Sequence, residues 1–134
     1  MELKKLTDRE LLLMKSIWDL GDGVRLAYIV KHVNEKYDMN WKPQTASTFL
    51  NKLVQKGYVR PYRDGQYIHY RILIQEQEYR NFVVKENLSF WNKGNAVAYV
   101  SDLFHVSELT KEDIKTLKGK LDELDDEELD VDID

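Results

Sequence analysis

The sequence predicts a mainly α-helical protein with one small β-hairpin. Apolar residues recur at helical spacing in six segments of the chain. Two segments of alternating polarity flank Asp64-Gly65, a dipeptide that favours tight hairpin turns. The chain has 134 residues, of which 43% are hydrophobic and 33% charged, so it can fold around a core of its own.

Two helices are expected before residue 40. The first begins at the capping box Thr7-Asp8-Arg9-Glu10, in which Thr7 and Glu10 bond the free amides of the first turn, and it ends at Gly21. A turn at Asp22-Gly23 follows. The second helix covers about residues 26–37, and its apolar stripe is Leu26, Ile29, Val30, Val33 and Tyr37.

A third helix begins at Pro43, whose missing N–H would be unpaired in a first turn anyway, and ends at Gly57. Its apolar side is Ala46, Phe49, Leu50, Leu53 and Val54. The opposite side has short polar residues and almost no acid: Gln44, Ser47, Thr48, Asn51 and Gln55, with Lys52 beside them. Such side chains can enter a major groove and bond base edges and phosphates. An ordinary solvated helix face is the alternative.

The hairpin is expected to pair Arg63 with Gln66, Tyr62 with Tyr67 and Pro61 with Ile68, with Asp64-Gly65 as its turn. In this register, one face suits the core and carries Val59, Pro61, Ile68 and Tyr70. The other face suits solvent or phosphate and carries Arg60, Tyr62, Tyr67, His69 and Arg71. Pro61 cannot donate to a ladder, so its strand should lie at an edge.

The net charge of −4 is distributed unevenly along the chain. Residues 1–40 are neutral, residues 41–74 hold 6 basic and 1 acidic residue for a net +5, and residues 75–134 hold 7 basic and 16 acidic residues for a net −9. A single basic block in an otherwise neutral or acidic chain indicates a polyanion site at that block. A solvated basic surface is the alternative.

Three helices followed by a hairpin give the order of a winged helix-turn-helix, with the third helix for recognition and the hairpin as the wing. Both lie in the basic block, so double-stranded operator DNA is the expected partner. The residues expected to contact DNA are Lys42, Pro43, Gln44, Thr45, Ser47, Thr48, Asn51, Lys52, Arg60, Arg63, Tyr67 and His69.

Helices are expected after the hairpin over about residues 75–90, from Ala96 to Phe104, and from Thr110 onward. They carry more apolar surface than they can bury by themselves, which favours a second copy of the chain; folding back on the first domain is the alternative. The residues expected at this homodimer interface are Tyr79, Phe82, Val83, Phe90, Val97, Val100, Leu103, Phe104, Ile114, Leu117 and Leu121.

The predicted organisation is therefore a winged-helix DNA-binding domain over residues 1–74, a helical dimerisation domain over 75–124 and an acidic, disordered tail over 125–134. The acidic end from Asp122 to Asp134 holds 9 acidic residues and no basic residue. An autoinhibitory tail that lies over the basic block in place of DNA is the alternative interpretation.

Several segments closely resemble the BlaI/MecI/CopY family of bacterial repressors over roughly residues 3–124. They are Leu6-Thr7-Asp8-Arg9-Glu10, Ile17-Trp18, Trp41-Lys42-Pro43-Gln44-Thr45-Ala46-Ser47-Thr48, Leu50-Asn51-Lys52-Leu53 and Lys56-Gly57-Tyr58. The resemblance implies a homodimer with N-terminal winged helices and intertwined C-terminal helices, which binds dyad-symmetric operators and blocks transcription.

The resemblance also implies a mode of regulation. In the β-lactam branch, a membrane-bound sensor protease leads to cleavage in the dimerisation region, and the corresponding segment here is Ser101-Asp102-Leu103-Phe104. That segment lacks the Asn-Phe pair of the penicillinase repressors. The copper branch senses metal through cysteine pairs, which this chain lacks. Lys42 replaces a capping serine of the family, and Ser47 replaces a residue that is often basic.

Other classes of function are poorly supported by the sequence. Asp102, His105 and Glu108 have helical spacing and resemble an acid–base or metal set, but no phosphate-binding loop, HExxH or nucleophile motif accompanies them. We therefore expect no catalytic residue, metal site or cofactor. A winged-helix adaptor for protein partners is the remaining alternative. The chain shows no signal peptide or membrane-spanning segment, so we expect a cytoplasmic protein that does not insert into a membrane.

Overall fold

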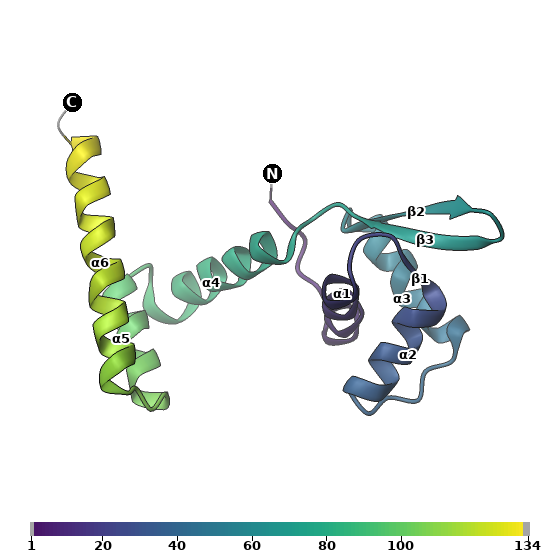
Figure 1. The fold of residues 1–134 in the computed structure, drawn as a ribbon, viewed down its shortest axis with the longest axis horizontal. Helices are drawn as coiled ribbons and strands as arrows, with labels where there is room; N and C mark the ends of the chain where they lie inside the picture. The colour runs from purple at the N-terminus through teal and green to yellow at the C-terminus, as the bar shows by residue number, and fades with distance from the viewer. Residues whose placement is uncertain (1, 133–134) are drawn as a thin grey trace. The chain divides into compact units, whose positions relative to one another are not determined.

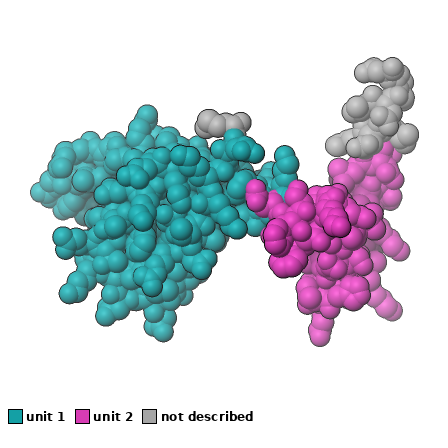
Figure 2. Space-filling view, turned by 180° about the vertical axis from the view of Figure 1, so that it is seen from behind, with its two compact units in different colours: residues 1–85 teal, residues 86–134 magenta. Residues whose placement is uncertain are grey.

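The computed structural model describes residues 2–132, with side chains as far as Asp126. It contains two compact units, residues 1–85 and residues 86–134 (Figures 1 and 2). The elements, in chain order, are α1 (Asp8–Leu20), β1 (Val24–Arg25), α2 (Leu26–Lys36), α3 (Pro43–Gln55), β2 (Val59–Asp64), β3 (Tyr67–Ile72), α4 (Glu76–Asn92), α5 (Ala96–Val106) and α6 (Lys111–Asp132). The predicted fold class, mainly α with a small hairpin, is confirmed.

The N-terminal unit packs α1, α2 and α3 around one apolar core (Figure 1). The predicted capping box opens α1, since Thr7 N–H donates to Glu10 Oε1 at 3.0 Å and Glu10 N–H donates to Thr7 Oγ1 at 3.4 Å. Helices α2 and α3 bury the side that their apolar spacing indicated. The fully buried apolar side chains of the three helices are Leu13, Met14, Ile17, Ile29, Val33, Ala46, Leu50 and Leu53.

A three-stranded antiparallel sheet in the order β1-β3-β2 completes the winged helix. Pro61 lies on β2, which is an edge strand as its missing N–H requires. The sequence did not indicate β1, because two residues are too short to show an alternating pattern. Gly23 precedes it with φ at +85°, and a Cβ there would lie 3.0 Å from the Tyr62 hydroxyl. A side chain at position 23 would therefore be strained.

The predicted register of the hairpin was wrong by two residues. Arg63 pairs with Ile68, Tyr62 with His69 and Pro61 with Tyr70, so Gly65 and Gln66 form the loop in place of Asp64 and Gly65. Type I′ turns need a positive φ at both central residues, whereas here only Gly65 of the loop has one, at 67°. A glycine at the first central position fits a type II′ turn instead.

A shift of two residues leaves each side chain on its predicted face of the hairpin. Val59 and Tyr70 are buried as expected, at 1% and 7% exposed. Pro61 is exposed and Ile68 is 41% exposed, because the core extends only under the base of the hairpin. The outer part of the wing therefore projects beyond the helices.

The first half of α4 belongs to the N-terminal unit, so the predicted boundary after residue 74 is too early. The hydroxyl of Tyr79 accepts a hydrogen bond from the Leu6 amide at 3.1 Å. Trp18 Nε1 donates to the Ile74 carbonyl at 2.9 Å, and Lys15 Nζ lies 2.6 Å from Glu76 Oε2. These contacts hold the start of α4 against α1.

The C-terminal unit contains the end of α4, all of α5, and α6 (Figure 2). Thr110 and Asp113 form the predicted cap of α6, with both hydrogen bonds at 3.0 Å. The helix continues to Asp132, so the prediction of a disordered tail from residue 125 was wrong as far as Asp132. Leu121 and Leu124 continue the apolar spacing, and neither proline nor glycine interrupts the chain between them and Asp132. Residues 133–134 of the expected tail lie outside the described residues.

Candidate nucleic-acid interface

Helix α3 is held in place by its apolar side, which packs in the core, and by contacts of the loop that precedes it. The Asn34 side chain donates to the Trp41 carbonyl and accepts from the Trp41 amide, both at 2.9 Å. The Trp41 ring stacks on Phe49 at 5.2 Å between centroids. These contacts fix the segment before Pro43, so the first turn of α3 has one orientation relative to α2.

The other side of α3 is available to a partner. Gln44, Thr45, Thr48, Asn51 and Lys52 are exposed, and Ser47 is half-buried. The Thr48 hydroxyl donates to the Gln44 carbonyl at 3.1 Å, which leaves its oxygen able to accept. Lys42 occupies the N-cap position without a side-chain cap, so free amides of the first turn face outward where the helix dipole favours an anion.

The wing is braced by aromatic groups on its two strands and by Arg25 of β1. Tyr62 and His69 lie opposite each other, with ring centroids 5.3 Å apart. His69 Nδ1 lies 2.8 Å from the Gly23 carbonyl oxygen, which joins the wing to the turn before β1. Tyr67 is 44% exposed, and the Arg25 guanidinium lies over its ring. Tyr67 and His69 therefore hold the wing as well as presenting polar atoms at its surface.

The cations of the basic block divide into two groups. Lys56 lies 2.5 Å from Glu10 Oε1, and Arg71 lies 3.2 Å from Asp22 Oδ2, so both are neutralised within the chain. Lys42, Lys52, Arg60 and Arg63 are exposed and form no ion pair with any described residue. These four lie at the N-cap of α3, on α3 and on β2. Their charge is available to a polyanion.

The penicillinase repressor family matches residues 6–123 of this sequence, nearly its whole length. The chain belongs to the penicillinase repressor family. The resemblance to the BlaI/MecI/CopY repressors is thus confirmed, and the protein is a DNA-binding repressor. A curated relative, the penicillinase repressor of Bacillus licheniformis, is 25% identical over 122 residues, which cover 91% of this chain and 93% of the relative.

Two solved structures match part of the chain. The solution structure of the DNA binding domain of the repressor BlaI is 27% identical, with a TM-score of 0.49, and covers 58% of this chain and 92% of that chain. The Bacillus licheniformis BlaI monomer in complex with the blaP half-operator is 27% identical, with a TM-score of 0.48 and the same coverage. The family assignment rests on the match over residues 6–123.

The residues expected at the dimer interface of this repressor separate into two groups. Tyr79 is 4% exposed within one chain, so its assignment to the interface was wrong. Phe82 and Val83 pack against the same N-terminal core and are also partly buried there. Tyr79, Phe82, Val83 and Phe90 follow one helical spacing in the sequence. Helix α4, however, begins in the N-terminal unit and ends in the C-terminal unit. The remaining residues are exposed to different degrees: Phe90, Val97, Val100, Leu103, Phe104, Ile114, Leu117 and Leu121.

Lys56 has a structural role that the charge count did not reveal. It pairs with Glu10, a carboxylate that is only 2% exposed. Burial opposes ionisation of Glu10, but hydrogen bonds from Lys56 and Thr7, together with the Lys56 charge, hold its pKa below the ordinary value of 4.5. Burial and the neighbouring Tyr79 and Glu10 raise the pKa of Tyr58 to about 12. This cluster stabilises the N-terminal unit and leaves Lys56 unavailable to DNA.

Sequence reasoning missed functional residues outside the basic block and the apolar stripes. Arg25 precedes the block by sixteen residues in sequence, yet it contacts the wing. Asn34 reads as an ordinary polar residue of α2, although it fixes the start of α3. Trp91 and Val106 are 71% and 83% exposed and extend the apolar surface of the C-terminal unit. The sequence signal that could have found Trp91 is its position directly after Phe90, which makes two adjacent large aromatic residues.

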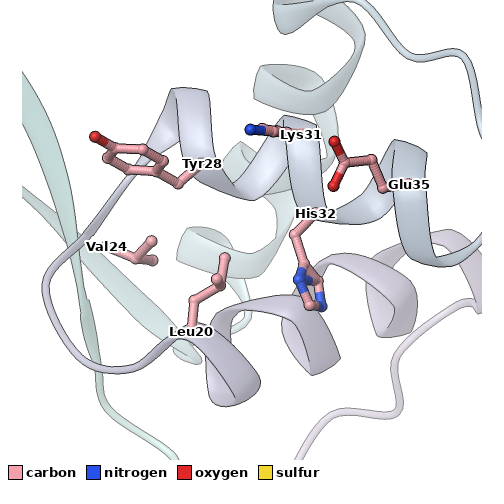
Figure 3. Close-up of a pocket in the computed structure, with 6 residues that line it drawn as sticks. All are labelled: Leu20, Val24, Tyr28, Lys31, His32 and Glu35. Atoms are coloured by element: carbon pink, nitrogen blue, oxygen red, sulfur yellow. The ribbon is translucent and has the colours of Figure 1, made fainter.

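A separate hollow of about 300 Å³ lies between the end of α1, β1 and α2 (Figure 3). Its lining residues are Leu20, Val24, Tyr28, Lys31, His32 and Glu35. Neither α3 nor the wing contributes to it, so it is distinct from the candidate nucleic-acid interface. Among the described residues, no set of three metal-ligating side chains gathers, and Asp102, His105 and Glu108 do not form one. Over the same part of the chain, no helix is both apolar enough and long enough to cross a bilayer.

Proposed function

We propose that two copies of this repressor join through their C-terminal units and bind a dyad-symmetric operator, each through α3 and the wing. One observation carries the proposal: Lys42, Lys52, Arg60 and Arg63 are exposed and unpaired within the described chain, on the helix and strand that the winged helix places against a duplex. Bound at a promoter, such a dimer blocks transcription.

The side chains of α3 divide into those that suit base edges and those that suit the phosphate backbone. Gln44, Ser47 and Asn51 carry amide or hydroxyl groups that suit base edges in the major groove. Thr45 and Thr48 suit a base edge or a phosphate, and Pro43 brings the first turn of α3 close to the backbone. The four cations bind phosphates and release counterions, which supplies affinity without sequence preference. Tyr67 and His69 contact the backbone from the wing.

The exposed apolar surface of the C-terminal unit supports the homodimer. None of the described side chains from Glu86 to Asp126 is buried within one chain. A stable soluble protein rarely leaves such a large apolar surface open, and a second copy covers it by symmetry. In the dimer, the two α3 helices read half-sites about 10 bp apart, or a multiple of that spacing.

Derepression follows from loss of this dimer, because one winged helix binds DNA much more weakly than two that are joined. The proposed cleavage segment, residues 101–104, lies in α5 and is exposed. A helix has to unwind locally before a protease can bind it as an extended strand. Cleavage of this segment by a sensor protease system therefore requires local unwinding of α5. Digestion of the chain by the inducer-activated protease, followed by mass analysis of the fragments, tests whether cleavage occurs there.

The test of DNA binding begins with selection of genomic fragments by the full-length protein, followed by titration of the recovered fragment at several salt concentrations. We expect enrichment of sites with dyad symmetry and an affinity that falls as salt rises. Changing Arg60 and Arg63 to Gln should reduce the slope of log affinity against log salt by about two.

Asn51→Ala provides the contrasting variant. It should lower the preference for the selected site over unrelated DNA by about 1–3 kcal/mol and leave the salt slope unchanged. Failure to enrich any fragment, together with an affinity that does not depend on salt, would contradict the proposal and favour a winged-helix adaptor for protein partners.

A further inference from the structure

The outer part of the wing has little support from the rest of the fold. Strand β1 pairs with β3 only at Val24–Tyr70 and Arg25–His69. Beyond His69, the ladder of β3 is with β2 alone. A groove of about 290 Å³ separates this part of the wing from the start of α2, and its lining residues are Arg25, Leu26, Ala27, Arg63, Gln66, Tyr67 and Ile68. Core packing therefore does not fix the wing tip.

Arg25 spans this groove. Its guanidinium carbon lies 3.5 Å from the centroid of the Tyr67 ring and 5.2 Å from that of Tyr28. Its Nε atom is buried without a hydrogen-bond partner, and the side chain forms no ion pair with any described residue. The cation is therefore held by aromatic faces, to which a planar guanidinium is suited.

Arg71 makes the other contact of this type on the wing, and it differs from Arg25. Its guanidinium lies 5.0 Å from the Tyr62 centroid, but it also pairs with Asp22 at 3.2 Å. Arg71 lies near the base of the hairpin, where β1 already supports the sheet. Tyr67 is the residue that follows the loop, so the Arg25 contact acts at the tip.

We propose that Arg25 is a positioning residue for DNA binding: it holds the wing tip at a fixed angle to α2 through the Tyr67 ring and does not itself contact a phosphate. The inference rests on the proposed function, in which the wing contacts DNA. With the contact intact, Arg60 and Arg63 on β2 reach the duplex without a cost for ordering the wing.

The experiment compares Arg25→Met, Tyr67→Leu, Tyr67→Phe and the double variant Arg25→Met/Tyr67→Leu in the full chain. Amide hydrogen exchange of residues 63–68 is measured without DNA, and affinity for the selected fragment is measured at several salt concentrations. Arg25→Met and Tyr67→Leu should each speed exchange and weaken binding by about two- to thirty-fold with the salt slope unchanged. In hydrogen exchange, the double variant should be no worse than either single variant, and Tyr67→Phe, which keeps the ring, should exchange as the parent does.

Arg63→Gln is the matched control, because it should lower the salt slope by about one and leave exchange at the wing unaffected. A slope reduced by about one in Arg25→Met, or additive effects of the two single variants, would overturn the proposal, since Arg25 would then contact phosphate or act independently of Tyr67. Unchanged exchange in Arg25→Met would also overturn it. If the parent protein fails to bind any fragment, the proposed function fails. Exchange at the wing would still test whether the contact between Arg25 and the Tyr67 ring holds the wing tip.

Discussion

In the N-terminal unit, Leu13, Ile17 and Leu50 are fully buried, whereas Val97 and Phe90 of the C-terminal unit are 80% and 75% exposed. Both units consist of amphipathic or apolar helices with similar sequence patterns. The N-terminal helices meet one another and a sheet around a common core. The helices of the C-terminal unit have no buried side chain among those described.

This difference indicates which part of the chain is complete by itself. The N-terminal unit buries its apolar groups, caps the start of α1 and pairs a buried carboxylate within one chain. The C-terminal unit leaves its apolar groups exposed in one chain. Helix α4 crosses between the two units, so the two kinds of behaviour meet within a single helix.

The largest effect is expected from charges placed on the open apolar surface. Val97→Asp/Leu121→Asp should convert the proposed dimer to a monomer, because the two positions are 80% and 61% exposed in one chain and belong to the surface that the proposed dimer covers. Affinity for the selected operator should fall by about 10²–10⁴-fold as bivalent binding is lost. Sedimentation velocity and DNA titration measure the two effects.

Thr116→Asp is the control for this variant, since it places a negative charge on the polar side of α6, where the Thr116 hydroxyl donates to the Glu112 carbonyl. It should remain dimeric with the parent affinity. A double variant that stays dimeric would show that the open surface is not the interface. It would also contradict the inference that the C-terminal unit needs a second copy to cover this surface.

Helix α4 allows the contrast to be tested at two aromatic residues of one element. Tyr79→Ala should lower the free energy of unfolding by about 3–5 kcal/mol, because the ring is 4% exposed in the N-terminal core. Phe90→Ala, at 75% exposed, should instead weaken the dimer and leave the N-terminal unit intact. Urea unfolding at one protein concentration measures the loss of stability, and sedimentation measures the loss of the dimer. Equal effects of both variants on the dimer would contradict the placement of the boundary inside α4.

The buried ion pair tests whether the N-terminal unit depends on its own polar contacts. Lys56→Met should destabilise the protein by about 3 kcal/mol, since the Glu10 carboxylate would remain buried without its cation. Lys52→Met removes the same charge from an exposed position and should change stability by less than about 0.5 kcal/mol. Chemical denaturation measures both. Similar losses in the two variants would argue that the Lys56 contact adds nothing beyond a surface charge.

A smaller effect is expected from acid. Because the pKa of Glu10 is lower in the folded protein than its ordinary value of 4.5, the ionised carboxylate contributes stability above that value. This contribution should be lost as the pH falls through the folded pKa. Glu10→Gln keeps the capping arrangement but cannot ionise. The difference in unfolding free energy between the parent and Glu10→Gln should therefore shrink on acidification, and a difference that is constant from pH 7 to acid would contradict it.

Local signals in the sequence were sufficient for the helices of the winged-helix unit. Thr7 and Glu10 mark the start of α1, Pro43 marks the start of α3, and the apolar spacing gives the buried sides. The register of the hairpin could not be obtained in this way, because Asp64-Gly65-Gln66 is compatible with two turns and both keep the same faces. Only the φ of Gly65 and the pairing of Pro61 with Tyr70 decide between them.

Contacts between distant residues were beyond the reach of sequence patterns. The α4 stripe contains Tyr79 and Phe90 at compatible spacing, and nothing local shows that one packs on Trp18 and the other does not. Charge counting found the basic block but could not show that Lys56 and Arg71 are neutralised within the chain. Arg25 was missed because its role depends on a wing residue 42 positions later.

The central claim is that one chain is incomplete and that its C-terminal unit requires a second copy. Sedimentation equilibrium of the full-length protein at micromolar concentration tests it most directly. The account predicts a mass twice that of the 15.9 kDa chain, with two chains in each complex with operator DNA. A protein that stays at the mass of one chain, and that binds its operator as one chain with undiminished affinity, would contradict it.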